Sequence, residues 1–394
     1  GVQTCALPIF GGLAAALSLL RRGFPVRVFE KVSTLREVGA GFHCTPNGVR
    51  VLQALGLGPA IESVAVPLED RDIRLWNSGR SWRIEGHGAE SRARYGAPYL
   101  LFHRGDLHAI LLEAVRALAP DCIETSAACT GIQLRDQGVT VDFEGGRRHD
   151  TAVLIGADGV HSAVRHSLWG TGRATFSGEI AWRGLIPIDK LPERMRARIT
   201  SNWIGPRGSV TVYPVRRVEL MNFVGLVARD DWRVESWTEQ GSLDECERDF
   251  AGWHEDVHLL IRNIDIAFKW ALFLRDPMGA WTRGRATLLG DACHPMTPYL
   301  GQGANMAIED AFVLARCLEA DADPASALQR YERVRIARDN DMVVKSTEQS
   351  KRIHDDTLAD PEAAVRYVEK NWDPERIKTR YDYIFDYDAT TVPV

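Results

Sequence analysis

Two buried-strand patterns, each ending in a glycine-containing turn with an aspartate, constrain this sequence more than any other feature. Ala152–Ile155 runs into the turn Gly156–Gly159, which contains Asp158, and Ala286–Leu289 runs into a glycine followed by Asp291. A helical pattern follows each of them, which indicates a parallel sheet with connecting helices. Open α/β sheets bind ligands at the carboxyl ends of their strands. The sequence therefore predicts that Asp158 and Asp291 lie at a ligand site.

A third strand-and-turn signal near the N-terminus is incomplete. Gly11 and Gly12 open a helical pattern, and the short strand pattern that follows ends in Glu30, 18 residues after Gly12. Glycines at a helix start let the backbone approach a pyrophosphate, and an acid about 20 residues later binds a ribose hydroxyl. We therefore expect Gly11, Gly12, Glu30 and the adjoining Lys31 to bind a dinucleotide. A plain helix–strand turn with a surface glutamate is the alternative.

Residues 1–9, GVQTCALPI, do not resemble a signal peptide, because they contain neither a starting Met nor a charged segment. The string resembles the translation of a sequencing-library adapter fused to a broken reading frame. Pro8 also suits a central strand poorly, because proline cannot donate to the hydrogen-bond ladder. We therefore exclude these residues from the fold prediction and expect the native first strand to be missing. A genuine but unusual N-terminal strand is the alternative.

Composition excludes several classes of protein. The chain has 394 residues, of which 45% are hydrophobic and 26% charged, so it can bury a large core and a cofactor. A net charge of -5 without a long basic run argues against nucleic acid and membrane partners. The seven scattered cysteines form no C-x-x-C motif, which argues against a disulfide framework or a zinc site. They favour a reducing compartment, and we expect a cytoplasmic protein.

The segments after the two aspartates complete both motifs. After Asp158, Gly159 permits close backbone approach, and a serine three residues later can cap a helix that carries Arg165. After Asp291 the sequence GQGANMAIED opens a helix near Gly303. The start of a helix carries partial positive charge and free N–H donors. Gly303, Ala304 and Asn305 are therefore expected to stabilise negative charge on a bound ring.

The region between residues 180 and 275 has a different character. Val210–Tyr213 and Leu220–Val227 read as an antiparallel hairpin, which we interpret as part of a substrate-covering sheet. From Pro324 onward the chain is charged and helical. We expect nucleotide-binding segments at 10–75, 99–179 and 276–325, substrate strands at 76–98 and 180–275, and a C-terminal helical segment at 326–394.

Taken in order, these motifs carry a resemblance to a known family. G-A-D-G-x-x-S-x-x-R at 156–165, G-D-A-x-H-P at 290–295 and G-Q-G-A-N-x-x-x-E-D at 301–310 resemble the class A FAD-dependent aromatic hydroxylases. The nearest group contains salicylate hydroxylase, 3-hydroxybenzoate 6-hydroxylase and 6-hydroxynicotinate 3-monooxygenase. The segment His103–His108 resembles the group's H-R-x-D-L, whose arginine, here Arg104, contacts FAD. Resemblance extends from residue 10 to the end and implies an α/β fold with a Rossmann-like FAD-binding domain (GR2-type), an inserted antiparallel β-sheet and C-terminal helices.

The resemblance also implies an activity. NADH or NADPH would reduce FAD, and O2 would form a C4a-hydroperoxide that hydroxylates a small aromatic acid. The expected partners are this acid and O2, with the chain as a monomer or homodimer and without nucleic acid or membrane. The implied FAD-binding residues are Gly11, Gly12, Glu30, Lys31, Gly41, Arg104, Asp158, Gly159, Arg165, Asp291, Gly303, Ala304 and Asn305.

Three residues are candidates for contact with the reacting substrate. His43 matches a substrate contact of 6-hydroxynicotinate enzymes, with a loop histidine of no catalytic role as the alternative. Tyr213 matches a tyrosine of the substrate sheet, and a plain sheet aromatic is equally expected. Pro298 would lie over the reactive edge of the flavin. Relatives that act on 3-hydroxybenzoate carry a glutamine there, so a salicylate-like substrate is expected first and a 6-hydroxynicotinate or 3-hydroxybenzoate type second.

Many relatives carry a histidine a few residues before the tyrosine that matches Tyr213. The corresponding positions here hold Ser209 and Val212. This departure leaves the catalytic base unassigned. Arg183, with the tryptophan before it, either binds an acidic substrate or forms a sheet-edge pair. Cys293 is interpreted as a small buried residue beside the flavin rather than a thiolate. We expect no metal site. A rival of another class is a flavin-binding protein without turnover, because the first strand is lost.

Overall fold

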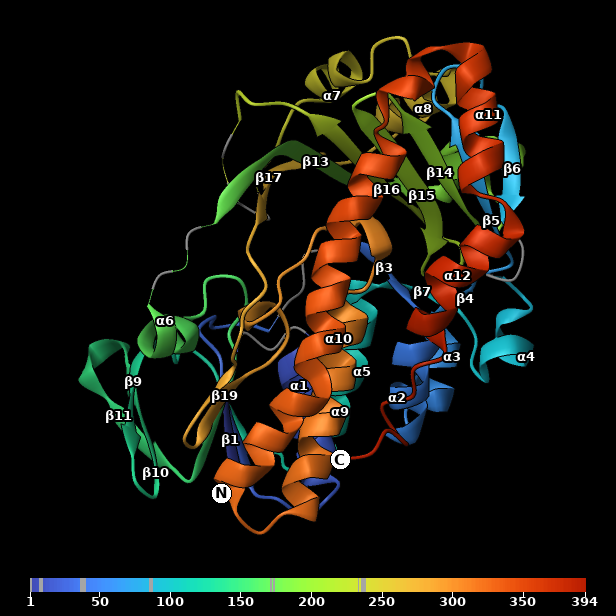
Figure 1. Cartoon of the computed structure of the whole chain (residues 1–394). Coiled ribbons are helices and arrows are strands. Elements are labelled where there is room, and N and C mark those ends of the chain that lie inside the picture. The colour runs from blue at the N-terminus through green and yellow to red at the C-terminus, as the bar shows by residue number, and fades with distance from the viewer. Residues whose placement is uncertain are drawn as a thin grey trace.

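The computed structural model describes residues 2–6, 10–35, 40–84, 88–170, 172, 174–232, 234 and 239–394, and of residues 2–6 the backbone alone. The described chain forms two halves, each built on its own large sheet (Figure 1). In Figure 1 the lower half holds the labelled ends of the chain, and a long helix runs along both halves. This arrangement places the carboxyl ends of the lower strands opposite the upper sheet.

The lower sheet has six strands in the order β18-β19-β12-β1-β2-β8. All neighbours run parallel except the edge pair β18 and β19. The strand patterns predicted from the sequence are confirmed within two residues at their ends. The bounds are β1 Val2–Ala6, β2 Val26–Phe29, β8 Ile123–Glu124, β12 Val153–Ala157, β18 Thr282–Arg283 and β19 Ala286–Leu288.

The exclusion of residues 1–9 from the fold prediction is wrong for residues 2–6. Val2–Ala6 forms β1 in the middle of the lower sheet, between β12 and β2. Strand pairing is made by backbone groups, which any non-proline residue offers, so an atypical sequence can still complete the ladder. The strand ends before Pro8, the residue thought incompatible with it. Residues 1 and 7–9 lie outside the described residues.

Helices cover the lower sheet and connect its strands. Helix α1 is buried along almost its whole length, because it lies between the sheet and its helical neighbours α9 and α5. This all-round burial explains its unbroken run of small and apolar residues. The bounds of the helices in this half are α1 Phe10–Leu20, α2 Pro46–Ala54, α3 Gly58–Val64, α4 Ser91–Tyr95, α5 Arg104–Leu118, α6 Ala163–Trp169 and α9 Gly303–Ala320.

Two small antiparallel sheets accompany the lower half. One follows the order β11-β10-β9, and the other, β3-β7-β4, lies between the two halves. Their strands are β3 Gly41–Cys44, β4 Val66–Pro67, β7 Leu100–His103, β9 Cys129–Arg135, β10 Gly138–Phe143 and β11 Arg148–Thr151. The second sheet matters for function because β3 carries the candidate His43.

The upper sheet has seven strands in the order β17-β13-β16-β15-β14-β5-β6, with α7 Leu243–Asp249 and α8 Glu255–Arg262 against one face. The predicted antiparallel hairpin is β15 with β16. The pair β14–β5 is parallel, so the sheet is mixed. The strands are β5 Asp70–Leu75, β6 Ser81–Ile84, β13 Thr175–Pro187, β14 Ile199–Gly205, β15 Gly208–Val215, β16 Leu220–Ala228 and β17 Phe268–Leu274.

Strand β5 departs from the expected segments. Residues up to 75 were expected to belong with the nucleotide-binding part, yet Asp70–Leu75 pairs with β14 in the upper sheet. The chain therefore crosses to the upper half before the predicted boundary at residue 75. Ile73 and Leu75 point into the upper core, and this burial explains why the strand joins that sheet.

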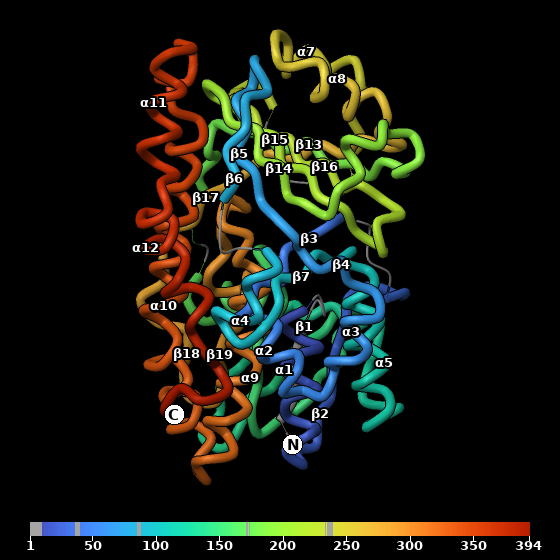
Figure 2. Tube along the Cα trace, turned by 90° about the vertical axis from the view of Figure 1, so that its right-hand side faces the viewer, coloured from blue at the N-terminus to red at the C-terminus, as the bar shows by residue number. Residues whose placement is uncertain are grey.

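Three helices complete the chain, and a shared signal starts each of them. Asp323, Asp360 and Asp373 each accept hydrogen bonds from first-turn N–H groups, and a proline follows each aspartate. The helices are α10 Pro324–Ile353, α11 Pro361–Asn371 and α12 Pro374–Phe385, and Figure 2 shows them stacked along one side of the molecule. No described helix is both long and apolar enough to cross a bilayer.

A buried ionic network joins α9 to α10. Arg335 is fully buried and donates to Glu309 at 2.6 Å, to Asp310 at 2.8 Å and to Asp339 at 2.7 Å. Arg338 donates to Glu309 at 2.9 Å. Buried charges require partners of this kind, because removing one leaves the others unpaired in a medium of low polarity.

We predict that Arg335→Met lowers the free energy of unfolding by about 3–5 kcal/mol, because three buried carboxylates lose the cation that they share. Urea unfolding measures the loss. Arg366→Met serves as the control, since the Arg366–Glu362 pair is largely exposed and is expected to contribute under about 1 kcal/mol. Equal unfolding midpoints for Arg335→Met and wild type would show that the network is not a stabilising element.

Candidate active site

The carboxyl ends of neighbouring strands lie along one edge of the lower sheet. β12 and β19 run parallel with Gly156 opposite Leu288, so Asp158 and Asp291 leave the sheet side by side. β2 runs parallel on the far side of β1 and ends just before Glu30. The predicted meeting of the two aspartates at one sheet edge is confirmed, and Glu30 joins them along the same edge.

The turn after β12 is held by its own side chains. Oδ2 of Asp158 accepts a hydrogen bond from the Val164 N–H at 3.1 Å, and Oδ1 accepts one from Ser162. The Ser162 hydroxyl also caps α6, as predicted from the sequence. Burial raises the pKa of Asp158, while these hydrogen bonds oppose the shift. Asp158 therefore shapes the turn that contains Gly159.

Asp291 lies against the start of α9. A Cβ placed on Gly303 would be 3.9 Å from Oδ1 of Asp291. No side chain caps this 18-residue helix at Gln302, and its first turn contains no acid. Arg165 ties this region to the preceding turn by donating to the carbonyl of Ala292 at 2.7 Å. A carboxylate and an uncapped helix start thus occupy the same place, as predicted.

Asn305 fixes the first turn of α9 to β3. Its amide nitrogen donates to the carbonyls of His43 at 2.9 Å and Gly301 at 2.8 Å, and its Oδ1 accepts from the Thr45 N–H at 3.1 Å. Ala304 packs against the lower core. Because the Asn305 side chain bonds within the protein, any ligand contact from this turn falls to backbone N–H groups.

Glu30 is fully buried at the end of β2, and its Oε1 accepts from the Val32 N–H at 2.9 Å. The alternative of a surface glutamate is therefore wrong. Lys31 beside it is exposed. Gly11, with Gly12, begins α1, and a Cβ on Gly11 would be 2.6 Å from a methyl group of Leu289. Gly11 therefore permits close packing between α1 and the strand end that leads to Asp291.

Arg104 begins α5 at the junction of the halves. Its guanidinium lies 5.3 Å from the ring centre of Phe10, and its backbone N–H donates to Ala40. Its charge opposes the burial-driven rises in the pKa of both Asp291 and Tyr213, so it acts on the strand end and on the upper sheet alike.

His43 and Tyr213 contact each other between the two halves. Their rings meet edge to face with centres 4.2 Å apart, and His43 Nδ1 lies 2.8 Å from the hydroxyl of Tyr99. Burial, reinforced by the charge of Arg71, lowers the pKa of His43 to about 3, so the imidazole is neutral near pH 7. Burial raises the pKa of Tyr213, which stays a phenol.

The backbone of β3 approaches the upper sheet closely at Gly41. Its N–H donates to Oδ1 of Asn222 at 2.7 Å. A Cβ at Gly41 would be 2.6 Å from the ring of Tyr213, so a glycine is required for this approach. Gly41 therefore sets the separation between the lower half and the face of the upper sheet that carries Tyr213.

That face of the upper sheet carries buried donors without acceptors among the described residues. Asn222 lies opposite Tyr213, and Arg71 lies opposite Thr200 on the neighbouring strands. Nε of Arg71, Nδ2 of Asn222 and of Asn202, and the Thr200 hydroxyl have no hydrogen-bond partner there. Buried donors without acceptors are costly, so the face suits a ligand rich in acceptor oxygens.

Pro298 opens a short turn, Pro298–Leu300, and is exposed between β19 and α9 in the chain. The next residue, Tyr299, donates to Oε2 of Glu179 on β13 at 2.7 Å. Sequence reasoning missed Glu179, as well as His354, which contacts the same carboxylate. No local pattern could have identified them, because they lie in separate elements.

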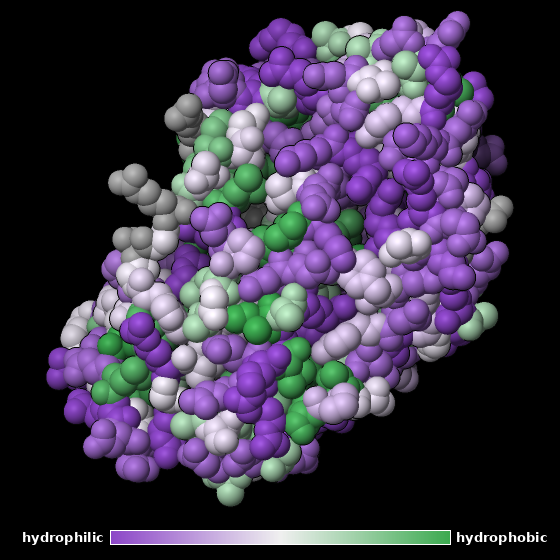
Figure 3. All heavy atoms as spheres, viewed as in Figure 1, coloured by the Kyte–Doolittle hydropathy of each residue, from purple (hydrophilic) through white to green (hydrophobic). Residues whose placement is uncertain are grey.

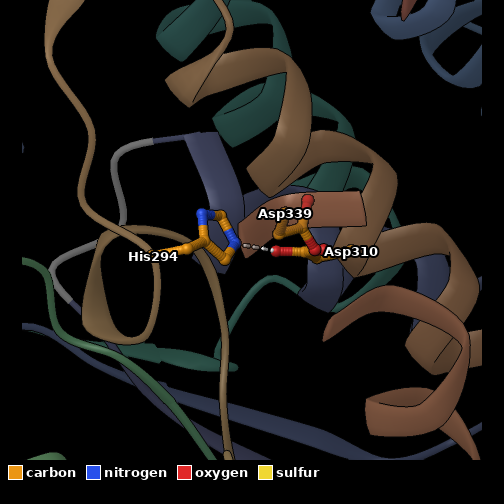
Figure 4. A group of neighbouring side chains, drawn as sticks. All are labelled: His294, Asp310 and Asp339. Atoms are coloured by element: carbon orange, nitrogen blue, oxygen red, sulfur yellow. Dashed lines mark hydrogen bonds and ion pairs between the residues drawn. The ribbon is translucent and has the colours of Figure 1, made fainter. Parts of the chain in front are cut away.

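His294, Asp310 and Asp339 form a buried cluster behind the turn after β19 (Figure 4). Nε2 of His294 lies 2.6 Å from Asp310. Burial alone would lower the pKa of His294, but Asp310 and Asp339 raise it well above its ordinary value. Both aspartates also accept hydrogen bonds from Arg335, so a metal ion would have to displace the Arg335 guanidinium. We interpret the cluster as an internal ion network.

Cys293 belongs to the same turn and is buried. Burial raises its pKa to about 12, and its Sγ lies 3.4 Å from the carbonyl of Gly290. The thiol is therefore protonated near pH 7. This agrees with the interpretation of Cys293 as a small packing residue.

The residues at this edge fit a flavin dinucleotide. Carboxylates at two strand ends can bind the hydroxyls of a ribose and of a polyol chain, and the uncapped start of α9 can face an electron-rich ring. Gly11 and Gly12 lie at the start of α1, where a pyrophosphate would be bound. This donor set is chemically matched to FAD.

Comparison with known proteins agrees with this geometry. The model of the FAD binding domain family matches residues 10–346. The chain is 43% identical over 344 residues to 3-amino-4-hydroxybenzoate 2-monooxygenase PtnB3 of Streptomyces platensis, covering 87% of this chain and 86% of that protein. It is 34% identical to 3-hydroxybenzoate 6-hydroxylase of Polaromonas naphthalenivorans, covering 96% and 94% of the two chains.

A solved structure extends the similarity to the whole fold. HpxO of Klebsiella pneumoniae, complexed with FAD and uric acid, aligns with a TM-score of 0.84 at 28% identity over 98% of this chain and 97% of that one. The expected fold of an FAD-binding part, a second sheet and C-terminal helices is thereby confirmed. The chain therefore belongs to the FAD binding domain family and is an FAD-dependent monooxygenase.

Proposed function

We propose that this chain hydroxylates a small aromatic ring that carries both a hydroxyl and a carboxylate, with NADH or NADPH as reductant and O2 as oxidant. The buried, unpaired donors on the upper sheet carry this proposal. Three of these atoms are N–H donors, on Arg71, Asn202 and Asn222. The fourth is the Thr200 hydroxyl, which can also donate. A carboxylate would supply the acceptor oxygens that they lack.

The strand ends of the lower sheet would hold FAD. Glu30 is positioned for a ribose hydroxyl, Asp291 for the polyol chain, and the first N–H groups of α9 for the flavin ring. Asp158 and Arg165 would act indirectly, since their side chains fix the turns beside the cofactor. When bound, the flavin supplies electron transfer from the nicotinamide and activation of O2.

The upper sheet and β3 would hold the substrate. His43 is neutral and bonded to Tyr99, so it serves as a hydrogen-bonding partner for the substrate rather than as a carrier of charge. Tyr213, a buried phenol, packs on His43 and helps to fix the position of the His43 ring. Pro298 would lie over the reacting edge and help to exclude water. On the side shown in Figure 3, apolar residues form separate groups, some near the middle of the molecule and others over the lower half.

Among hydroxylated aromatic acids, we place 3-amino-4-hydroxybenzoate first. The relative with that activity is the most similar of those described above. Salicylate, 3-hydroxybenzoate and 6-hydroxynicotinate share the ring carboxylate and hydroxyl and remain alternatives. We also propose a monomer or homodimer. A cytoplasmic location is proposed because every cysteine whose side chain the structure describes is a free thiol.

We predict that 3-amino-4-hydroxybenzoate accelerates NADH or NADPH oxidation by the FAD-loaded protein at least tenfold over the rate without an aromatic acid. The reason is that ring binding completes the water-excluding site. Oxygen uptake and product identification by mass spectrometry measure coupling, and the three alternative acids form the panel. Benzoate, which offers the carboxylate without a hydroxyl, is the control. If no acid in the panel yields a hydroxylated product, the proposed function is wrong.

We predict that Asp291→Asn weakens FAD binding about 10- to 150-fold, because a charge-assisted hydrogen bond contributes about 1.5–3 kcal/mol. Titration of the apoprotein with FAD, followed by flavin fluorescence, measures the change. Asp136→Asn, at an exposed turn between β9 and β10, is the control and should bind FAD as wild type does. Unchanged affinity in Asp291→Asn would argue against this strand end as the polyol site.

A further inference from the structure

A second polar chain lies on the same face of the upper sheet, beyond the residues assigned above. Nδ1 of His354 lies 2.8 Å from Oε1 of Glu179, and Nε2 lies 2.9 Å from Oγ of Ser209. Tyr299 donates to the other carboxylate oxygen at 2.7 Å, and Ser350 donates to Oε1 at 3.1 Å. One imidazole therefore bridges a carboxylate and a hydroxyl.

This second polar chain lies on the same face of the upper sheet as the residues proposed to bind the substrate. Ser209 is on β15 and shares its face with Thr211 and Tyr213, because alternate residues of a strand point the same way. Thr211 between them is half-buried. On the other side, Tyr299 connects Glu179 to the turn that begins at Pro298. Ser209 is thus the end of the chain that faces the substrate side of the sheet.

This order of groups is suited to carrying a proton. A carboxylate on Nδ1 keeps the proton of a neutral imidazole there and leaves the lone pair of Nε2 for the neighbouring hydroxyl. Ser209 is only 2% exposed, so its hydroxyl is shielded from bulk water. It is therefore suited to relaying a proton rather than to attacking a substrate.

We propose that Ser209 and His354 accept the phenolic proton of the substrate and that Glu179 positions the imidazole. The inference rests on the proposed function, since it requires a phenolic substrate. The substrate O–H bond breaks, and its proton passes to Ser209 Oγ as the Ser209 proton passes to His354 Nε2. The products are a phenolate and an imidazolium paired with the Glu179 carboxylate, with no change of oxidation state.

The other candidate bases are less suited. The pKa of His43, about 3, makes it too weak a base to retain a phenolic proton, and its Nδ1 already lies within hydrogen-bond distance of Tyr99. Tyr213 stays protonated. The groups that face the His354 ring are Glu179 from β13, Ser209 from β15 and Tyr299 from the Pro298 turn. Burial alone would raise the pKa of Glu179, but His354, Tyr299 and Ser350 lower it, so its charge is available to the imidazolium.

The test uses the FAD-loaded protein and 4-hydroxy-3-nitrobenzoate, whose phenol and phenolate forms absorb at different wavelengths. We expect Ser209→Ala and His354→Gln each to raise the pH at which the bound phenol ionises by about one unit or more. With the turnover substrate, kcat should fall about 100-fold or more, because proton transfer by a positioned group contributes about 10²–10⁴-fold. KM and probe affinity should change less than about threefold.

Two further variants separate proton transfer from structure. The double variant Ser209→His/His354→Ala places an imidazole directly on the substrate face and should recover at least about a tenth of wild-type kcat. His258→Gln is the matched control, since His258 faces Glu247 at 3.7 Å on the far face of the sheet, and it should behave as wild type.

The outcomes are distinguishable. If wild type hydroxylates the acid but Ser209→Ala and His354→Gln keep its ionisation pH and kcat, the proton relay is wrong and the proposed function stands. The relay is also wrong if kcat falls in these variants while the ionisation pH of the bound probe does not move. If wild type hydroxylates no phenolic acid, both proposals fail.

Discussion

The parallel pairing of β12 with β19 is the constraint on which the site depends. Backbone hydrogen bonds fix the register of these strands, and that register decides that Asp158 and Asp291 leave the sheet together. The Arg165 guanidinium then holds the two turns at a fixed spacing. Because α9 begins against Asp291, a negative side chain and the positive end of a helix dipole act at one place. The geometry at this end of the lower sheet therefore depends on strand register and on one half-buried cation, Arg165.

The upper sheet adds a different kind of specificity. Its inner face combines aromatic packing at Tyr213 with donors that find no acceptor within the described chain. Such groups lower the stability of the empty protein and are expected where a ligand completes the hydrogen bonds. The hydrogen bond from the Gly41 N–H to Asn222 keeps this face close to the lower strand ends. The strand-end carboxylates and the unpaired donors therefore lie on separate sheets, and the Gly41–Asn222 hydrogen bond is one of the contacts that join the two halves.

Local patterns explain what the sequence could predict. The strand-end aspartates and the start of α9 are predicted from glycine turns, and the β15–β16 hairpin from two strand patterns around a short polar turn, all within a short window. β1 was wrongly excluded because backbone pairing tolerates an atypical sequence. Glu30 could not be told from a surface acid, since its burial arises from tertiary packing. Ser209 and His354 lie 145 residues apart, and neither has a local signature, so their contact exists only once α10 packs on the upper sheet.

Helix α10 fixes the distance between one residue in the lower half and one at the upper sheet. Arg335 anchors it in the lower half, and His354 at its C-terminal end reaches the upper sheet 19 residues later, a span of about 28 Å along a helix axis. Adding or deleting one residue between them would rotate His354 by about 100° and carry it away from Glu179. The number of residues between these anchors is therefore constrained more tightly than their identity, and natural variation along this stretch should proceed by replacement rather than by insertion or deletion.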